Sequence, residues 1–339
     1  MTRAVVPIAA ALIVLGGMQS TTPDIDRGVR DVLAGALQFS AGELADLQRG
    51  RAVKHGLEAR APGEFGVAGG IRIAATKTAF LDAARDIASF KAGEQVLQIG
   101  RFSSPPAIED LGALNVGKAD FDAASCRVGD CDVRLPADVI RRIPTEIDLG
   151  GRAAQDQTAA WFTRVLLADV QAYVSGGPGR FVQYDDGSRP IRPVDAFDGV
   201  LAATPSIGML VPGLPAHLSQ FPSNSVSGSE DFLYWSKESF GPDPFITVTH
   251  VTIVCPTTNT CVMTTKDVYS SRYIDASLAL AIVTDAAAGD AIYVIYANRS
   301  RVNALRGALS ALRKSVVERR ARSTLEQSLL RLKARLEKK

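Results

Sequence analysis

The sequence predicts an α+β fold in which an antiparallel sheet wraps round a long C-terminal helix and carries a mostly helical insertion. Three observations lead to this prediction. From Asp231 to Arg301, apolar, β-branched and aromatic runs separated by turns indicate three or four strands. From Val302 to Leu336, apolar residues recur at helical spacing without a proline. Before residue 103, strand-like and helix-like patterns alternate.

The N-terminal residues 1–20 have the layout of a secretory signal peptide. Arg3 precedes an apolar run from Ala4 to Leu15, and small and polar residues follow. The run is shorter than the ~20 residues of a membrane span, and an uncleaved anchor is the alternative. We therefore expect an exported protein, periplasmic or secreted.

The next elements follow from the spacing of the apolar residues. Residues 21–48 form a helical lead-in, and the main domain extends from 49 to 339. The start of this domain is predicted to contain strands at 50–57 and 64–73, a helix at 75–90 and a strand at 96–102.

Residues 103–230 interrupt this pattern. The segment opens as a loop, contains its strongest helical pattern at 155–174, and becomes rich in Pro and Gly after Gly176. We interpret it as a mostly helical insertion that packs against the sheet. A separate domain is the alternative.

The four cysteines form two local pairs, Cys126 with Cys131 and Cys255 with Cys261. Each pair encloses a short loop with Gly or Pro and polar turn residues, so two local disulfides are expected, as in an oxidising compartment. The alternative is a four-cysteine zinc site, but such sites usually use tighter C-x2-C pairs. We predict no metal site.

Charge is concentrated at the C-terminus. Residues 301–339 hold 12 Lys/Arg against 3 Glu, whereas the whole chain has a net charge of only +2. The C-terminal helix is therefore basic. We interpret this as a solvated face of a helix packed on the sheet, and peripheral contact with an anionic membrane surface is the alternative. Nucleic acid is not expected, because the basic run has no interleaved aromatic residues.

The order of elements resembles the START-like, or helix-grip, superfamily. The residues that carry the resemblance are GIRIAATKTAFLDAARDIASFKAGEQVLQIGRF (70–102) and YANRSRVNALRGALSALRKSVVERR (296–320). The resemblance implies a cavity between sheet and helix. The superfamily includes lipid carriers, polyketide cyclases and other enzymes, so the fold alone does not define an activity.

Candidate ligand-binding residues lie in the predicted sheet and at the start of the last helix. Tyr and Trp combine an apolar body with a polar group, which suits an amphipathic ligand. The alternative is that these aromatic residues form core and cross-strand pairs. The candidates are Trp235, Phe240, His250, Tyr269, Tyr273, Tyr293, Tyr296 and Arg299.

His250 is the candidate residue best suited to take part in a chemical reaction. Strict alternation in FITVTHVTIV places it on the same face as Ile246, Val248, Thr252 and Val254. A neutral buried imidazole bonded to a hydroxyl is one interpretation, and a general base is the other. No motif for a nucleotide, a cofactor or a catalytic serine occurs.

These observations favour an exported, non-catalytic protein that binds or carries a lipid or another hydrophobic small molecule. Two alternatives remain open: a START-like cyclase or hydrolase that uses His250, and an envelope protein that interacts through its basic helix.

Overall fold

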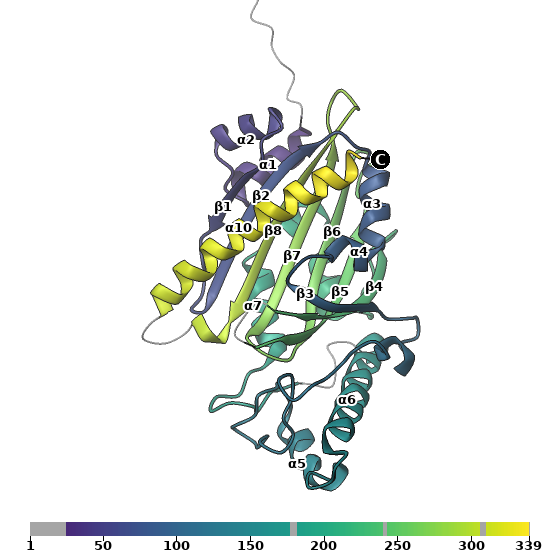
Figure 1. The fold of residues 1–339 in the computed structure, drawn as a ribbon. Coiled ribbons are helices and arrows are strands. Elements are labelled where there is room, and N and C mark those ends of the chain that lie inside the picture. The colour runs from purple at the N-terminus through teal and green to yellow at the C-terminus, as the bar shows by residue number, and fades with distance from the viewer. Residues whose placement is uncertain (1–24, 177–181, 240–242, 306–309, 339) are drawn as a thin grey trace, which may run out of the picture.

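The fold is α+β, as the sequence predicts. A computed structural model describes residues 25–176, 182–239, 243–305 and 310–338. One eight-stranded antiparallel sheet has the order β1-β2-β8-β7-β6-β5-β4-β3, and a long C-terminal helix packs against it (Figure 1). The expected signal peptide and Phe240 lie outside the described residues.

The sheet holds more strands than the C-terminal pattern predicts. Alternating and β-branched residues favour extended chain throughout this region, and each strand pairs with the next in a meander. Where we expected three or four strands there are five: β4 (Glu230–Glu238), β5 (Phe245–Val254), β6 (Thr260–Ser270), β7 (Ile274–Asp285) and β8 (Ile292–Val302).

Earlier strands complete the two sides of this meander. β2 (Glu64–Ile73) pairs with β8, and β1 (Val53–Leu57) pairs with β2 to form one edge. β3 (Val96–Arg101) pairs with β4 and forms the other edge. The strands expected at 50–57, 64–73 and 96–102 are therefore confirmed.

The C-terminal helix α10 (Ser310–Leu336) lies diagonally across one face of the sheet (Figure 1). Its buried residues Leu325, Leu329 and Leu336 join an apolar cluster with that face and with α3 (Lys77–Arg85) and α4 (Ile87–Lys91). The helix begins later than residue 302, because β8 extends to Val302 and a short 3-10 helix, η2 (Asn303–Leu305), follows.

Five short helices cover the opposite face. The expected lead-in helix is two helices, because Gln38 adopts a left-handed backbone (φ 62°) and Ser40 caps a new start with Glu43. These two helices and three from the insertion bury one continuous apolar cluster on the sheet. They are α1 (Arg27–Gly35), α2 (Ala41–Gln48), α7 (Pro193–Ala202), α8 (Ser206–Leu210) and α9 (Leu214–Gln220).

The rest of the insertion packs at the β4–β6 side of the sheet. It contains η1 (Ile108–Leu111), α5 (Ala137–Glu146) and α6 (Ala154–Gly176). A third apolar cluster joins these elements to strand residues, with Trp161 of α6 and Trp235 of β4 both fully buried. Helices are therefore the main regular structure in the described part of the insertion, as predicted.

Both local disulfides are formed. Cys126 is bonded to Cys131, and Cys255 to Cys261 at the β5–β6 turn. The two bonds indicate an oxidising, non-cytoplasmic environment. Within the described ranges, no helix has the length and apolarity needed to cross a membrane.

Candidate functional site

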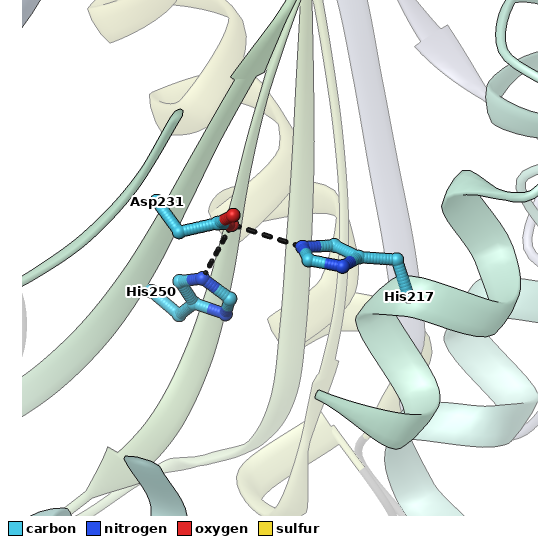
Figure 2. Close-up of side chains that lie close together, drawn as sticks. All are labelled: His217, Asp231 and His250. Carbon is cyan, nitrogen blue, oxygen red and sulfur yellow. Dashed lines mark hydrogen bonds and ion pairs between the residues drawn. The ribbon is translucent and has the colours of Figure 1, made fainter. Parts of the chain in front are cut away.

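Three ionisable side chains from different elements meet on the face covered by α9. His217 comes from α9, Asp231 from the start of β4 and His250 from the middle of β5 (Figure 2). The Nε2 atoms of both histidines lie 2.9 Å from the same Asp231 oxygen, Oδ1. We call these three residues the His-Asp-His cluster.

Further contacts fix each member of this cluster. The Nδ1 atom of His217 lies 2.7 Å from the carbonyl oxygen of Asn224, and Nδ1 of His250 lies 2.8 Å from the hydroxyl of Tyr173. The hydroxyl of Thr252 donates to Asp231 Oδ1 at 2.7 Å. The network thus connects α6 and α9 of the insertion to β4 and β5 of the sheet.

The environment separates the pKa values of the cluster members. Hydrogen bonding to Asp231 raises the pKa of His217, whereas burial lowers the pKa of His250. Burial alone would raise the pKa of Asp231, but hydrogen bonds from His217, His250 and Thr252 outweigh it and hold that pKa well below its usual range. The surroundings thus favour the charged forms of His217 and Asp231 and the neutral form of His250.

Lys266 lies on β6 opposite His250. Its ammonium group donates to the carbonyl oxygen of Leu218 at 2.6 Å and lies over the rings of Phe197 and Tyr173. Burial lowers the pKa of this lysine to about 8.

The His-Asp-His cluster is enclosed, since the side chain of His250 has no exposed surface and that of Asp231 is 20% exposed. A general base must reach its substrate, so the described conformation gives His250 no such access.

A separate, open groove of about 710 Å³ lies between the first disulfide loop and the β6–β7 turn. Its lining is mainly polar and comes from distant parts of the chain. The lining residues are Lys118, Ala119, Asp122, Ser125, Asp132, Arg134, Asp186, Asp243, Ser271, Arg272, Tyr273 and Asn303.

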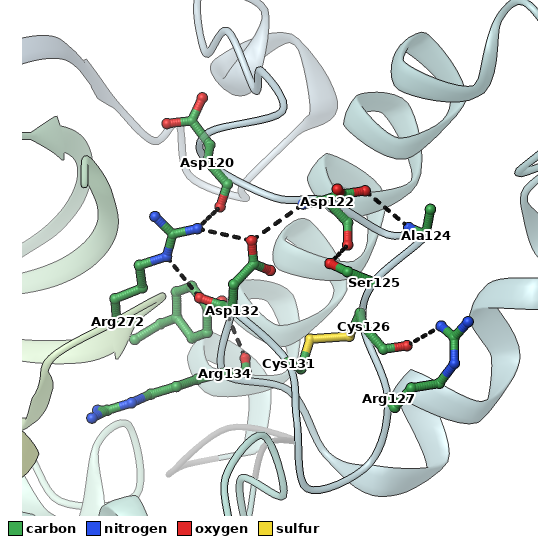
Figure 3. Close-up of a disulfide and its surroundings, with 11 residues drawn as sticks. Asp120, Asp122, Ala124, Ser125, Cys126, Arg127, Cys131, Asp132, Arg134 and Arg272 are labelled. Carbon is green, nitrogen blue, oxygen red and sulfur yellow. Dashed lines mark hydrogen bonds and ion pairs between the residues drawn. A yellow bond between two sulfur atoms is a disulfide. The ribbon is translucent and has the colours of Figure 1, made fainter. Parts of the chain in front are cut away.

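Arg272 holds one wall of the groove in place. Its guanidinium donates to the carbonyl oxygens of Asp120 and Asp132 and to the carboxylate of Asp132 (Figure 3). It also donates to the carbonyl oxygens of Ala119 and Pro244. The Cys126–Cys131 bond closes the same loop. Because this guanidinium is occupied by protein oxygens, its role is to position the loop.

The guanidinium of Arg134 is also bonded to other groups of the protein. Its guanidinium donates to the backbone oxygen of Ile274 and pairs with Asp275 at 2.6 Å. Two of the acidic groups are paired, Asp132 with Arg272 and Asp122 with Lys118. Burial raises the pKa of Asp132 and Asp186, and Oδ1 of Asp186 is buried without a hydrogen-bond partner among the described residues. The groove lining thus holds four carboxylates and three cationic side chains, two of which are the arginines bonded to protein oxygens.

The structure distributes the candidate residues from the sequence over several places. Trp235 and Tyr269 are buried in the cluster shared with the insertion, where Trp235 Nε1 donates to Asp110 O at 2.8 Å. Tyr293 is buried under the short helices on the same side of the sheet, and Tyr296 packs on the α10 side.

Two candidates lie at the ends of strands. Arg299 is buried in an ion pair with Glu64 at 2.6 Å, and Tyr273 lies at the β6–β7 turn with a left-handed backbone (φ 62°) and lines the groove. Of the described candidates, His250 belongs to the His-Asp-His cluster and Tyr273 to the groove. The structure does not bring the set together in one cavity.

The sequence did not predict that His217, Asp231 and Tyr173 lie together with His250. They come from three different elements, α6, α9 and β4, and no local spacing relates them. The alternation of β5 correctly places His250 beside Thr252, since both side chains contact Asp231.

Comparisons with protein-family models, curated proteins and solved structures found no match. The groove and the His-Asp-His cluster are therefore interpreted from their own geometry.

Proposed function

We propose that the chain is an exported binding protein, periplasmic or secreted, that holds a small polar molecule in the groove without covalent chemistry. The observation that carries this proposal is the groove itself. Its volume of about 710 Å³ lies in the ~300–1,000 Å³ range of small-molecule sites, and its walls are fixed by Arg272 and a disulfide.

The charges of the groove favour a ligand rich in hydrogen-bond donors. Both arginines donate to protein oxygens, and the lining holds four aspartates, Asp122, Asp132, Asp186 and Asp243, against the further cation Lys118. Tyr273 adds an aromatic ring to the same wall. An amine or an amino sugar has the complementary chemistry, because ammonium and hydroxyl groups donate to carboxylates.

The hydrophobic ligand expected from the sequence has less support. On the α10 side, Leu325, Leu329 and Leu336 are buried against apolar sheet residues, so side chains occupy the interface where a lipid cavity was expected. A hydrophobic ligand remains a prediction that the same experiment tests.

The test is ligand uptake by the full mature chain purified from an exporting host. Native mass spectrometry and thermal shift are measured with amines, amino sugars, neutral sugars, fatty acids and sterols. We expect amines or amino sugars to bind. The Asp132→Asn variant should weaken binding by about 10-fold or more, the typical effect of one charged hydrogen bond.

Asp290→Asn is the matched control, because the Asp290 side chain is 66% exposed and lies outside the groove. Uptake of lipids alone, or equal uptake by Asp132→Asn and the control, would contradict the proposed site.

A further inference from the structure

We propose that the His-Asp-His cluster is a binding site for a divalent transition-metal ion of the zinc class. Its three ligand atoms, two imidazole nitrogens and one carboxylate oxygen, all lie within 4.8 Å of one another. In Figure 2 both rings direct a nitrogen at the carboxylate of Asp231. The site is distinct from the groove and independent of the proposed function.

The ligand types and spacing suit such an ion. Zinc binds imidazole nitrogen and carboxylate oxygen at about 2.0–2.2 Å, so two ligands in a tetrahedral site lie about 3.3 Å apart. Each Nε2 atom lies 2.9 Å from Asp231 Oδ1. To admit the ion, side-chain rotations would widen these two contacts by a few tenths of an ångström and bring the two imidazole nitrogens, which lie within 4.8 Å of each other, to a similar separation.

The hydrogen bonds of His217 carry the argument further. Its Nδ1 faces the carbonyl oxygen of Asn224, which only accepts, so Nδ1 carries a hydrogen. Its Nε2 then faces the carboxylate of Asp231, which also only accepts. This second contact is attractive only if a cation lies there, either a second ring proton or a metal ion.

Outer partners already orient every proposed ligand. Metal-binding histidines usually donate their other N–H to a carbonyl, carboxylate or similar acceptor. Asn224 O takes this role for His217, and the Tyr173 hydroxyl takes it for His250. Thr252 donates to Asp231 Oδ1, so the carboxylate is also held.

The surroundings select the class of ion. Calcium and magnesium prefer six or more oxygen ligands, which two imidazoles do not supply, whereas imidazole suits zinc, copper, iron and nickel. The ammonium of Lys266 donates to Leu218 O. Among the described residues, the Asp231 carboxylate bonds to His217, His250, Thr252 and Ser229. Asp231 is 20% exposed and provides the route from solvent.

The test uses the full mature chain after dialysis against a chelator. Isothermal titration with Zn²⁺ should give one site of micromolar affinity or tighter. His217→Gln and His250→Gln should each weaken binding by about 100-fold or more, since loss of an outer partner alone typically costs about 10–100-fold. His55→Gln is the matched control, because His55 also bridges a carboxylate and a carbonyl, those of Glu43 and Leu37, but has no second histidine.

A second measurement does not depend on the variants folding. Co²⁺ added to the wild-type chain should give the intense visible absorption of a four- or five-coordinate site with nitrogen ligands. No Zn²⁺ binding at millimolar metal, a pale six-coordinate Co²⁺ spectrum, or equal affinity in His250→Gln and His55→Gln would each overturn the metal site and leave a ring proton as the only cation there.

Discussion

Replacing Arg134 with methionine is expected to destabilise the protein by about 3–5 kcal/mol, the usual effect of removing one partner of a buried ion pair. Arg134 and Asp275 join the insertion to β7, with 2.6 Å between Nη2 and Oδ1 and side-chain exposures of 3% and 0%. Without the guanidinium, the Asp275 carboxylate stays in the interior without its cationic partner.

The same reasoning applies when the other partner is removed. Asp275→Leu should cost a similar amount, because it leaves the buried guanidinium without its anion. The double variant, Arg134→Met with Asp275→Leu, should cost much less than the sum of the two. Replacing a whole buried pair by apolar residues is often close to neutral or stabilising.

Urea unfolding followed by tryptophan fluorescence measures this directly. Both tryptophans of the chain, Trp161 and Trp235, are buried in the apolar cluster between the insertion and the sheet. Their fluorescence therefore reports on the contact between insertion and sheet that Arg134 stabilises. If either single variant lowers the free energy of unfolding by less than about 1 kcal/mol, which is typical of an exposed pair, the reasoning is refuted. Strict additivity in the double variant would refute it as well.

Three further predictions concern the packing of α10 on the sheet, the disulfide loop of the groove and the pH dependence of stability. Leu329→Ala should cost about 2–5 kcal/mol, while its neighbour Leu330→Ala, 48% exposed, should change stability by less than about 0.5 kcal/mol; equal costs in denaturant unfolding would contradict the packing of α10. Replacing Cys126 and Cys131 by serine should cost about 2 kcal/mol for so short a loop and should reduce amine uptake by the groove; unchanged uptake in native mass spectrometry would argue against this loop as a wall of the site. Burial raises the pKa of Asp267 to about 7, among Lys91, Tyr234, Glu238 and Tyr296, with a hydrogen bond from Thr249. Because the folded chain keeps this proton while the unfolded chain loses it near pH 4, the stability contribution is fully present below about pH 4 and is lost as pH rises through 7. Asp267→Asn should therefore gain about 2–3 kcal/mol relative to wild type between pH 5 and pH 8, and parallel stability curves for the two proteins would contradict the raised pKa.

Local patterns predicted the fold well because they are set by neighbouring residues. Alternation located β2 and β5, helical spacing located α6 and α10, and short cysteine separations gave both disulfides. The predicted element boundaries were wrong where no residue in the sequence signals a turn. The last helix starts at Ser310 because β8 extends to Val302, and no proline or glycine between Asn298 and Val302 signals that strand end.

The sites were harder to predict because they depend on long-range contacts. Tyr293 and Tyr296 lie three residues apart on β8, so the period of two already places them on opposite faces, and one cavity cannot hold both. His217 meets His250 only because α9 packs on β5, and Arg272 reaches the disulfide loop from a distant turn. No local spacing encodes either contact.

The pairing of β2 with β8 also determines when the sheet can be completed during synthesis. Glu64 of β2 pairs with Arg301 of β8, more than two hundred residues later, whereas the four pairings within β4 to β8 each join consecutive strands. Contacts between distant segments form slowly, because a long loop must close before they are made. The central strands can associate early, but the N-terminal edge must wait for the end of the chain. The order of the strands therefore makes the N-terminal edge of the sheet depend on the synthesis of β8.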